Sequence, residues 1–132
     1  MQTKQIIKSA SEYLANRKDI VFAYLFGSYA SGRPATISDI DIAIFIDESK
    51  EEQINKLQLI HEFSEALNTD SLDLVILNKA PISLVYRIIE NRIILIDRNP
   101  LKRHRFESLA MRKHFDFSFF EKGILERRYL HG

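Results

Sequence analysis

The fold is determined by residues 21–47, whose sequence is VFAYLFGSYASGRPATISDIDIAIFID. The first six residues are apolar and rich in strand-forming types, so we expect a buried strand that ends at Gly27. Residues 27–38 are dense in Gly, Ser, Pro and Thr, which predicts a short helix or a loop. Residues 39–47 carry Ile at every even position, and this period of two predicts a second strand.

The remaining segments extend this pattern into a mixed α/β domain. Helices are expected over residues 3–16, over 50–68, from Pro81 through Ile89 and from Pro100 almost to the end, and further strands over 71–77 and 92–96. In the second of these helices the expected apolar face comprises Ile54, Leu57, Ile60, His61, Phe63, Ala66 and Leu67. The fold class is therefore α/β (α+β), with a small mixed sheet of about four strands flanked by helices.

Length and composition favour one compact domain over residues 1–132. The chain has no Cys, which excludes disulfide frameworks, thiolate zinc sites and Cys nucleophiles. No stretch approaches the roughly 20 apolar residues of a membrane span, and the N-terminal residues contain no apolar signal core. We therefore expect a cytoplasmic protein without a membrane partner.

The formal net charge of +1 conceals an asymmetry. Residues 1–97 carry 10 Lys and Arg against 14 Asp and Glu, whereas residues 98–132 carry 9 against 4. The near-neutral total argues against direct nucleic-acid binding as the main task. The basic C-terminal tail, residues 98–132, is also aromatic, and two interpretations stay open: a helix that packs on the domain with its charges solvated, or a surface that contacts a partner.

Three carboxylates occupy matching positions on two expected strands. Asp39 and Asp41 are two residues apart, so both side chains leave the same face with Cβ atoms roughly 7 Å apart. Asp73 lies on the face of its own expected strand opposite Leu72, Leu74 and Ile76. If the two strands are adjacent in the sheet, all three carboxylates converge. Convergent carboxylates suit Mg²⁺, and two such ions can clamp both oxygens of a phosphoryl displacement. The alternative is that inward-pointing charges protect edge strands from pairing.

The pair Gly27-Ser28 follows the first strand directly. Gly permits a sharp turn and close approach of a phosphate, and Ser28 is expected to cap a short helix over Tyr29 to Gly32 whose N–H groups favour an anion. Such a pair also occurs in ordinary turns. Its position gives it more weight, because ten residues separate it from the carboxylate pair Asp39 and Asp41.

The run Gly27-Ser28, ten residues, Asp39-Ile40-Asp41 resembles the signature of the polymerase-β-like nucleotidyltransferase superfamily, and Asp73 matches its third carboxylate. The short chain is most similar to the minimal nucleotidyltransferases (MNT), the antitoxin half of HEPN/MNT toxin–antitoxin pairs. The resemblance implies the polymerase-β-like fold. One position departs from it, because Ser31 stands where relatives often have Arg.

The resemblance also implies roles for these residues. Asp39, Asp41 and Asp73 would be catalytic and would bind two Mg²⁺ ions, while Gly27 and Ser28 would bind the nucleotide triphosphate. The implied reaction transfers AMP from ATP to a tyrosine hydroxyl of a cognate HEPN ribonuclease toxin and neutralises it. Two alternatives stay open: a non-catalytic antitoxin that acts by occlusion of the toxin, and a nucleotidyltransferase with a small-molecule acceptor.

Overall fold

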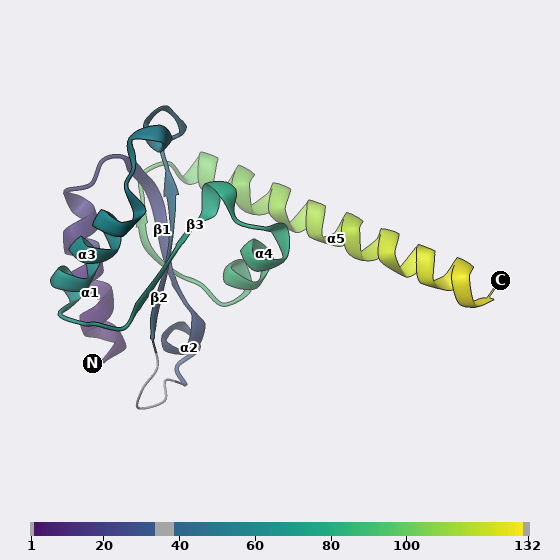
Figure 1. Ribbon diagram of the computed structural model, residues 1–132, viewed down its shortest axis with the longest axis horizontal. Helices are drawn as coiled ribbons and strands as arrows, with labels where there is room; N and C mark the ends of the chain where they lie inside the picture. The colour runs from purple at the N-terminus through teal and green to yellow at the C-terminus, as the bar shows by residue number, and fades with distance from the viewer. Residues whose placement is uncertain (1, 34–38, 131–132) are drawn as a thin grey trace.

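A computed structural model describes residues 2–33 and 39–130, with side chains as far as Phe117, and its strands form a four-stranded sheet (Figure 1). The strands are β1 (Ile20–Phe26), β2 (Ile40–Ile46), β3 (Leu72–Ile76) and β4 (Ile93–Asp97), in the order β3-β2-β1-β4. β1 pairs antiparallel with β2 and β4, and β2 pairs parallel with β3. The mixed sheet and the α/β fold class are confirmed. Residues 34–38 of the expected short helix or loop over 27–38 lie outside the described residues.

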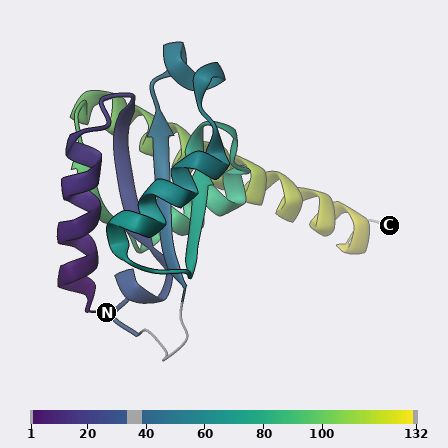
Figure 2. The ribbon, with the colours of Figure 1, turned by 60° about the vertical axis from the view of Figure 1, so that its left-hand side comes forward.

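Helices cover both faces of this sheet (Figures 1 and 2). α1 (Thr3–Ala15) and α3 (Lys56–Leu67) lie on one face, and α4 (Ile82–Glu90) and α5 (Pro100–Leu130) lie on the other. Pro81 directly precedes α4, where its missing N–H costs no helical hydrogen bond. The four-residue helix α2 (Gly27–Ala30) connects β1 to the segment before β2.

The alternation expected in β2 is confirmed. The core between the sheet and helices α1 and α3 contains Ile40, Ile42, Ile44 and Ile46 together with Ile6, Leu14 and Phe63. The core on the opposite face contains Ala43 and Phe45 together with Phe22, Val85 and Ile88. Full burial of one such Ile contributes about 2 kcal/mol. A shift of β2 by one residue against its neighbours would move every Ile to the other face, so this register is strongly preferred. The register therefore fixes the face on which Asp41 lies.

The expectation of one continuous helix over residues 50–68 is wrong. A 3-10 helix, η1 (Glu48–Gln53), is followed by extended backbone at Ile54, and α3 begins only after Asn55. The Asn55 side chain accepts a hydrogen bond from the backbone N–H of Gln58, so it caps a new helix start. Leu57 consequently faces outward and is 78% exposed, although the apolar pattern assigned it to the buried face.

The strand boundaries differ from expectation by one residue at most. β2 stops at Ile46, and the Asp47 carboxylate after it accepts a hydrogen bond from Ser49 N at 3.1 Å and caps η1. β4 begins at Ile93, and the side chain of Arg92 before it donates to Glu107.

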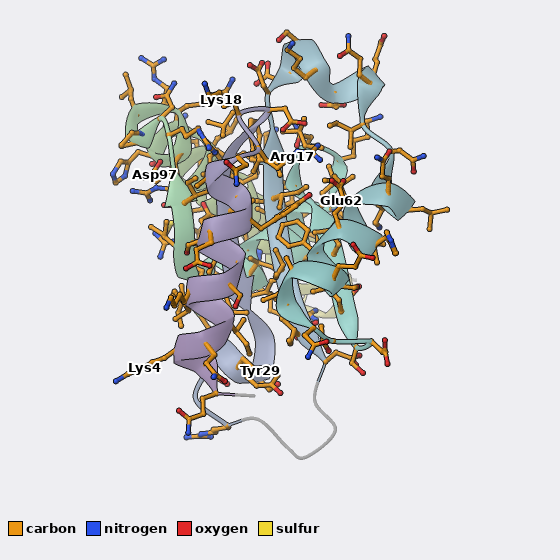
Figure 3. All side chains as sticks on the ribbon, turned by 90° about the vertical axis from the view of Figure 1, so that its left-hand side faces the viewer. Lys4, Arg17, Lys18, Tyr29, Glu62 and Asp97 are labelled. Carbon is orange, nitrogen blue, oxygen red and sulfur yellow. The ribbon has the colours of Figure 1, made fainter. Side chains whose placement is uncertain are left out.

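Ion pairs secure α1 at the end far from α2. Arg17, just after the helix, contacts Asp19 with Nη2 to Oδ2 at 2.7 Å and Glu62 of α3 with Nη1 to Oε2 at 3.1 Å. Figure 3 shows Arg17 and Glu62 at this end, with Tyr29 at the other. These contacts connect the end of α1 to the residue before β1 and to α3.

α5 packs on the sheet through a charged network as well as through apolar contacts. Glu107 accepts hydrogen bonds from the Tyr24 hydroxyl at 2.6 Å and from Arg103 Nη1 at 2.9 Å, and it pairs with Arg92. Phe106 and Ala110 pack into the core beside it. The tail thus packs as one interpretation expected, but Arg103 and Glu107 are buried rather than solvated.

Beyond these contacts α5 continues away from the rest of the molecule (Figure 1). Over the part of the chain that the structure describes, no helix combines the length and the apolar character needed to cross a membrane.

Candidate functional site

Two of the three expected carboxylates lie directly opposite each other. Asp41 of β2 and Asp73 of β3 are register partners in the parallel pair, so both side chains leave the same face of the sheet. Asp39 precedes β2 by one residue and is exposed. The adjacency of the two strands, which the sequence left conditional, brings the carboxylates together.

The electrostatics of Asp41 reflect this crowding. Burial, together with the negative charges of Asp73 and Asp39, raises the pKa of Asp41 to about 6 from the ordinary 3.8. The cost of ionising Asp41 is removed by any cation placed among the three carboxylates. The cluster therefore favours a positively charged ligand.

The glycine turn lies against this cluster. Phe26, the last residue of β1, is the register partner of Asp41, so Gly27 follows at the same end of the sheet. Gly27 has φ +73°, and a Cβ atom built on it would overlap Oδ2 of Asp41. Only glycine tolerates this contact together with a positive φ, so the Asp41 carboxylate lies directly against the backbone of the turn.

Ser28 occupies a different helical position from the one expected. The short helix is Gly27–Ala30, with extended backbone at Phe26 as its N-cap and no side-chain cap hydrogen bond, so the expectation that Ser28 caps a helix over 29–32 is wrong. The Ser28 carbonyl accepts hydrogen bonds from Ser31 Oγ at 3.0 Å and Arg33 N at 3.0 Å. Ser31 thus closes the turn.

The donor set fits a hard cation that keeps part of its own shell. In the ranges whose side chains are described, 2–33 and 39–117, no three His, Asp or Glu side chains are arranged as a complete metal site. Mg²⁺ is bound in many proteins by one or two carboxylates, with waters and substrate phosphates completing its shell. Asp41 and Asp73, with Asp39 beside them, provide carboxylate oxygens of this kind, and the Gly27 turn lies next to Asp41.

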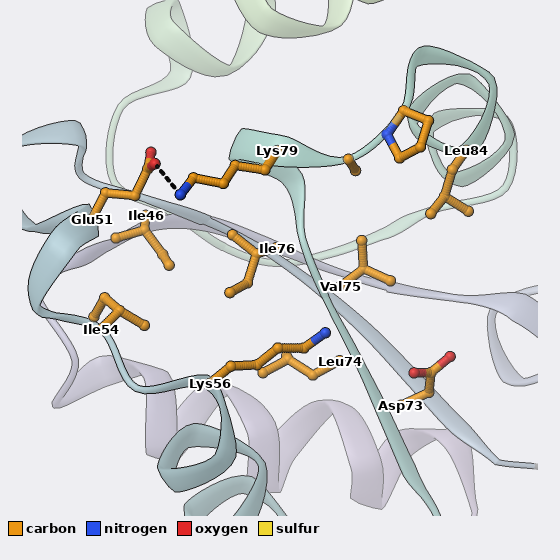
Figure 4. A pocket seen from close by; sticks show the side chains of 12 residues that line it. Ile46, Glu51, Ile54, Lys56, Asp73, Leu74, Val75, Ile76, Lys79 and Leu84 are labelled. Atoms are coloured by element: carbon orange, nitrogen blue, oxygen red, sulfur yellow. Dashed lines mark ion pairs between the residues drawn. The ribbon is translucent and has the colours of Figure 1, made fainter.

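A groove that the sequence did not predict begins at Asp73. It has a volume of about 460 Å³ and follows β3 between α3 and the start of α4 (Figure 4). Its wall includes Lys56, Lys79 and Leu84, which come from three different elements. No local pattern could have revealed it, because it exists only where β3 forms the edge of the sheet.

Comparison with solved structures places this geometry among known folds. A chain from the structure described as a toxin–antitoxin with AMP-PNP is 22% identical, with 96% of this chain and 97% of that chain covered and a TM-score of 0.72. A chain from the tri-AMPylated Shewanella oneidensis HEPN toxin in complex with MNT antitoxin is 19% identical, with 95% and 97% covered and a TM-score of 0.70. At these identities the likeness establishes the fold.

The mixed sheet with its glycine turn and carboxylate-bearing strands is the architecture of a nucleotidyltransferase. The chain belongs to the family described as polymerase beta, nucleotidyltransferase, whose model matches residues 8–101. A search among curated proteins finds no match to this sequence. The resemblance inferred from the spacing of Gly27, Ser28, Asp39 and Asp41 is thereby confirmed at the level of the family.

Proposed function

We propose that this protein is a Mg²⁺-dependent adenylyltransferase that transfers AMP from ATP to a tyrosine hydroxyl of a HEPN ribonuclease toxin and thereby neutralises it. The observation that carries the proposal is the register of Asp41 opposite Asp73, with the Gly27 turn against Asp41. This arrangement combines cation-binding oxygens with a backbone that a triphosphate can approach.

The residues divide by chemistry. Asp39 and Asp41 would hold the ion that accompanies the triphosphate, and Asp73 would complete a second site. Mg²⁺, when bound, neutralises the charge of the phosphates. Gly27 and Ser28 bind the triphosphate through backbone N–H groups and the Ser28 hydroxyl.

Asp73 orients the acceptor hydroxyl and accepts its proton. The hydroxyl oxygen then forms a bond to the α-phosphorus, the bond from that phosphorus to the bridging oxygen breaks, and pyrophosphate leaves with its electron pair.

The choice of a protein acceptor is supported by α5 and by the structural neighbours. The described part of α5 presents large exposed apolar side chains, which are Leu101, Leu109, Met111, Phe115 and Phe117. Exposed basic residues, Arg105 and Arg112, lie among them. Apolar and aromatic groups interleaved with Arg are typical of protein interfaces. One neighbour is described as a tri-AMPylated HEPN toxin in complex with MNT antitoxin, which supports a protein acceptor here.

Intact mass spectrometry tests the proposal. The test acceptor is the product of the adjacent gene, which the proposal requires to be a small helical protein (hereafter the neighbouring helical protein). It is incubated with the purified chain, ATP and Mg²⁺, and we expect the addition of adenylyl units. The addition disappears with Asp41→Asn or with chelation of Mg²⁺, and it persists with Glu12→Gln, an exposed carboxylate on α1.

Protection of cells separates the catalytic proposal from simple occlusion. If Asp41→Asn still protects cells at full strength while transferring no AMP, the proposed reaction is not how the toxin is silenced. Transfer to a small molecule such as an aminoglycoside, with none to the neighbouring protein, would assign a different acceptor.

A further inference from the structure

β3 is an edge strand with an open side. It pairs with β2 alone among the described strands, at one end of the order β3-β2-β1-β4. An edge strand presents unpaired backbone donors and acceptors, which readily accept a further strand.

The register identifies the backbone groups that face outward. Ile40 N donates to Ser71 O at 2.9 Å, so the Ser71 carbonyl points toward β2. Backbone groups alternate in direction along a strand, and those of Asp73 and Val75 therefore also point toward β2. The outward groups belong to the three alternate residues Leu72, Leu74 and Ile76.

The groove lies over this same edge. Leu74 and Ile76 contribute from one face of β3, and Asp73 and Val75 contribute from the other. Figure 4 shows the strand running through the groove, with Asp73 at one end and the Lys79–Glu51 ion pair toward the other. An occupant that pairs with the edge would thus extend to a carboxylate of the candidate site.

The charges along the groove are unequal. Lys79 Nζ lies 3.6 Å from Glu51 Oε2, so its charge is partly compensated. Lys56, on the α3 side, forms no ion pair within the part of the chain that the structure describes, and it lines the groove together with Leu74. An acidic side chain on the occupant would complement it.

We propose that the polypeptide acceptor binds this groove in extended form, as an added strand on β3. Its backbone pairs with the outward groups of Leu74 and Ile76, its hydroxyl lies at Asp73, and an acidic side chain farther along meets Lys56. This inference rests on the proposed function and adds how the acceptor is held. We choose a polypeptide over the base of the nucleotide because the outward backbone groups of Leu74 and Ile76 lie along the groove, where they can pair with a further strand.

Steady-state transfer to the neighbouring helical protein gives the first test. Ile76 has φ −92° and an outward N–H, so Ile76→Pro removes one edge donor without removing a sheet hydrogen bond. We expect this variant to raise KM for the protein acceptor about tenfold, the equivalent of one lost hydrogen bond with its desolvation, and to leave KM for ATP unchanged. Ile76→Ala, which loses apolar volume but keeps the N–H, is the matched control. Thermal unfolding of both variants checks that each is folded.

Charge reversal gives a second variant that does not alter the backbone. Lys56→Glu should raise KM for the protein acceptor while Lys8→Glu, an exposed lysine on α1, should not. A rise in KM for ATP instead of the acceptor would assign the groove to the nucleotide base and overturn the proposal.

Photo-crosslinking makes the docking site testable without transfer. A benzoylphenylalanine replacing Leu84, on the groove wall, should crosslink to the neighbouring helical protein, and one replacing Lys8 should not. If AMP transfer occurs but position 84 gives no crosslink and both groove variants keep the wild-type KM, the groove proposal is wrong and the proposed function stands. If no transfer occurs yet position 84 crosslinks selectively, the docking site stands and the proposed reaction fails.

Discussion

The Cα atom of Gly27 lies so close to the Asp41 carboxylate that a Cβ atom added to this glycine would overlap Oδ2 of Asp41. Gly32, five residues later, has nearly the same φ, +74° against +73°. Among the described residues other than its chain neighbours, no heavy atom lies within 4 Å of a Cβ built on Gly32. Substitutions at the two glycines can therefore be compared, to distinguish the cost of a positive φ from the effect of a contact with Asp41.

Gly27→Ala and Gly32→Ala should each destabilise the fold by about 1 kcal/mol, because both place a Cβ atom in the left-handed region. We expect only Gly27→Ala to abolish AMP transfer, since it also displaces the Asp41 carboxylate. Urea unfolding measures the first effect and mass spectrometry the second. Equal activity of the two variants would show that the contact with Asp41 is irrelevant to the reaction.

Asp41→Asn should stabilise the metal-free protein at neutral pH. The pKa of Asp41 is raised from 3.8 to about 6, so ionisation of this carboxyl costs more in the folded state than in the unfolded state. The two proteins should be equally stable below pH 4, where the carboxyl is protonated in both states. The advantage of the variant should grow as the pH rises from about 4 to about 6 and then stay constant, at about 1 kcal/mol after allowance for solvent screening.

Unfolding curves at pH 4, 6 and 8 without Mg²⁺ test this pH dependence. A variant that is less stable than the wild type at pH 8 would contradict the crowding of carboxylates around Asp41.

Glu107→Ala should destabilise the protein by about 3–5 kcal/mol, because it leaves the guanidinium groups of Arg92 and Arg103 without their buried carboxylate. Burial opposes ionisation of Glu107, but hydrogen bonds from Arg92 and Tyr24 outweigh it and lower its pKa below 4.5. The stabilisation is therefore present above pH 4.5 and is lost as the pH falls below that value. Urea unfolding measures the change, and Asp116→Ala, an exposed carboxylate of the same helix, should be nearly neutral.

Arg98→Met should cost about 1–3 kcal/mol through loss of charge-assisted hydrogen bonds to backbone carbonyls. Arg98 Nη1 donates to Ile20 O at 2.9 Å, and Nη2 donates to Leu14 O at 2.8 Å at the end of α1. Arg105→Met, at an exposed position of α5, is the control. Equal unfolding midpoints would mean that Arg98 does not fix the end of α1.

Phe117→Ser should weaken binding to the neighbouring helical protein without lowering stability. Its side chain is 60% exposed on the projecting part of α5, so little apolar contact within the domain is lost. Ile94→Ser, at a position 38% exposed on β4 at the other end of the sheet from β3, is the control and should bind normally. Calorimetric titration measures both, and a larger loss for Ile94→Ser would place the partner on the β4 side.

Most of the fold follows from local patterns. The alternation of residues 39–47 predicted a strand with both faces assigned, and the assignment is confirmed by the two cores that Ile44 and Phe45 enter. The pattern failed at residues 50–68, because the capping side chain of Asn55 competes locally with the apolar repeat that included Leu57. The spacing of apolar residues indicates which face of a helix is buried, but it does not reveal a helix boundary set by a capping side chain.

The sequence by itself determined the residue types of the candidate site, their spacing and the family resemblance. Only the tertiary structure decided that β3 lies parallel beside β2 with Asp73 opposite Asp41, that Gly27 contacts Asp41, and that an open edge continues the site into a groove. It also decided that Glu107 is buried in the network holding α5. The reason is that periodicity and turn chemistry act between near neighbours, whereas strand order, register and burial of charge depend on pairing between segments far apart in the chain.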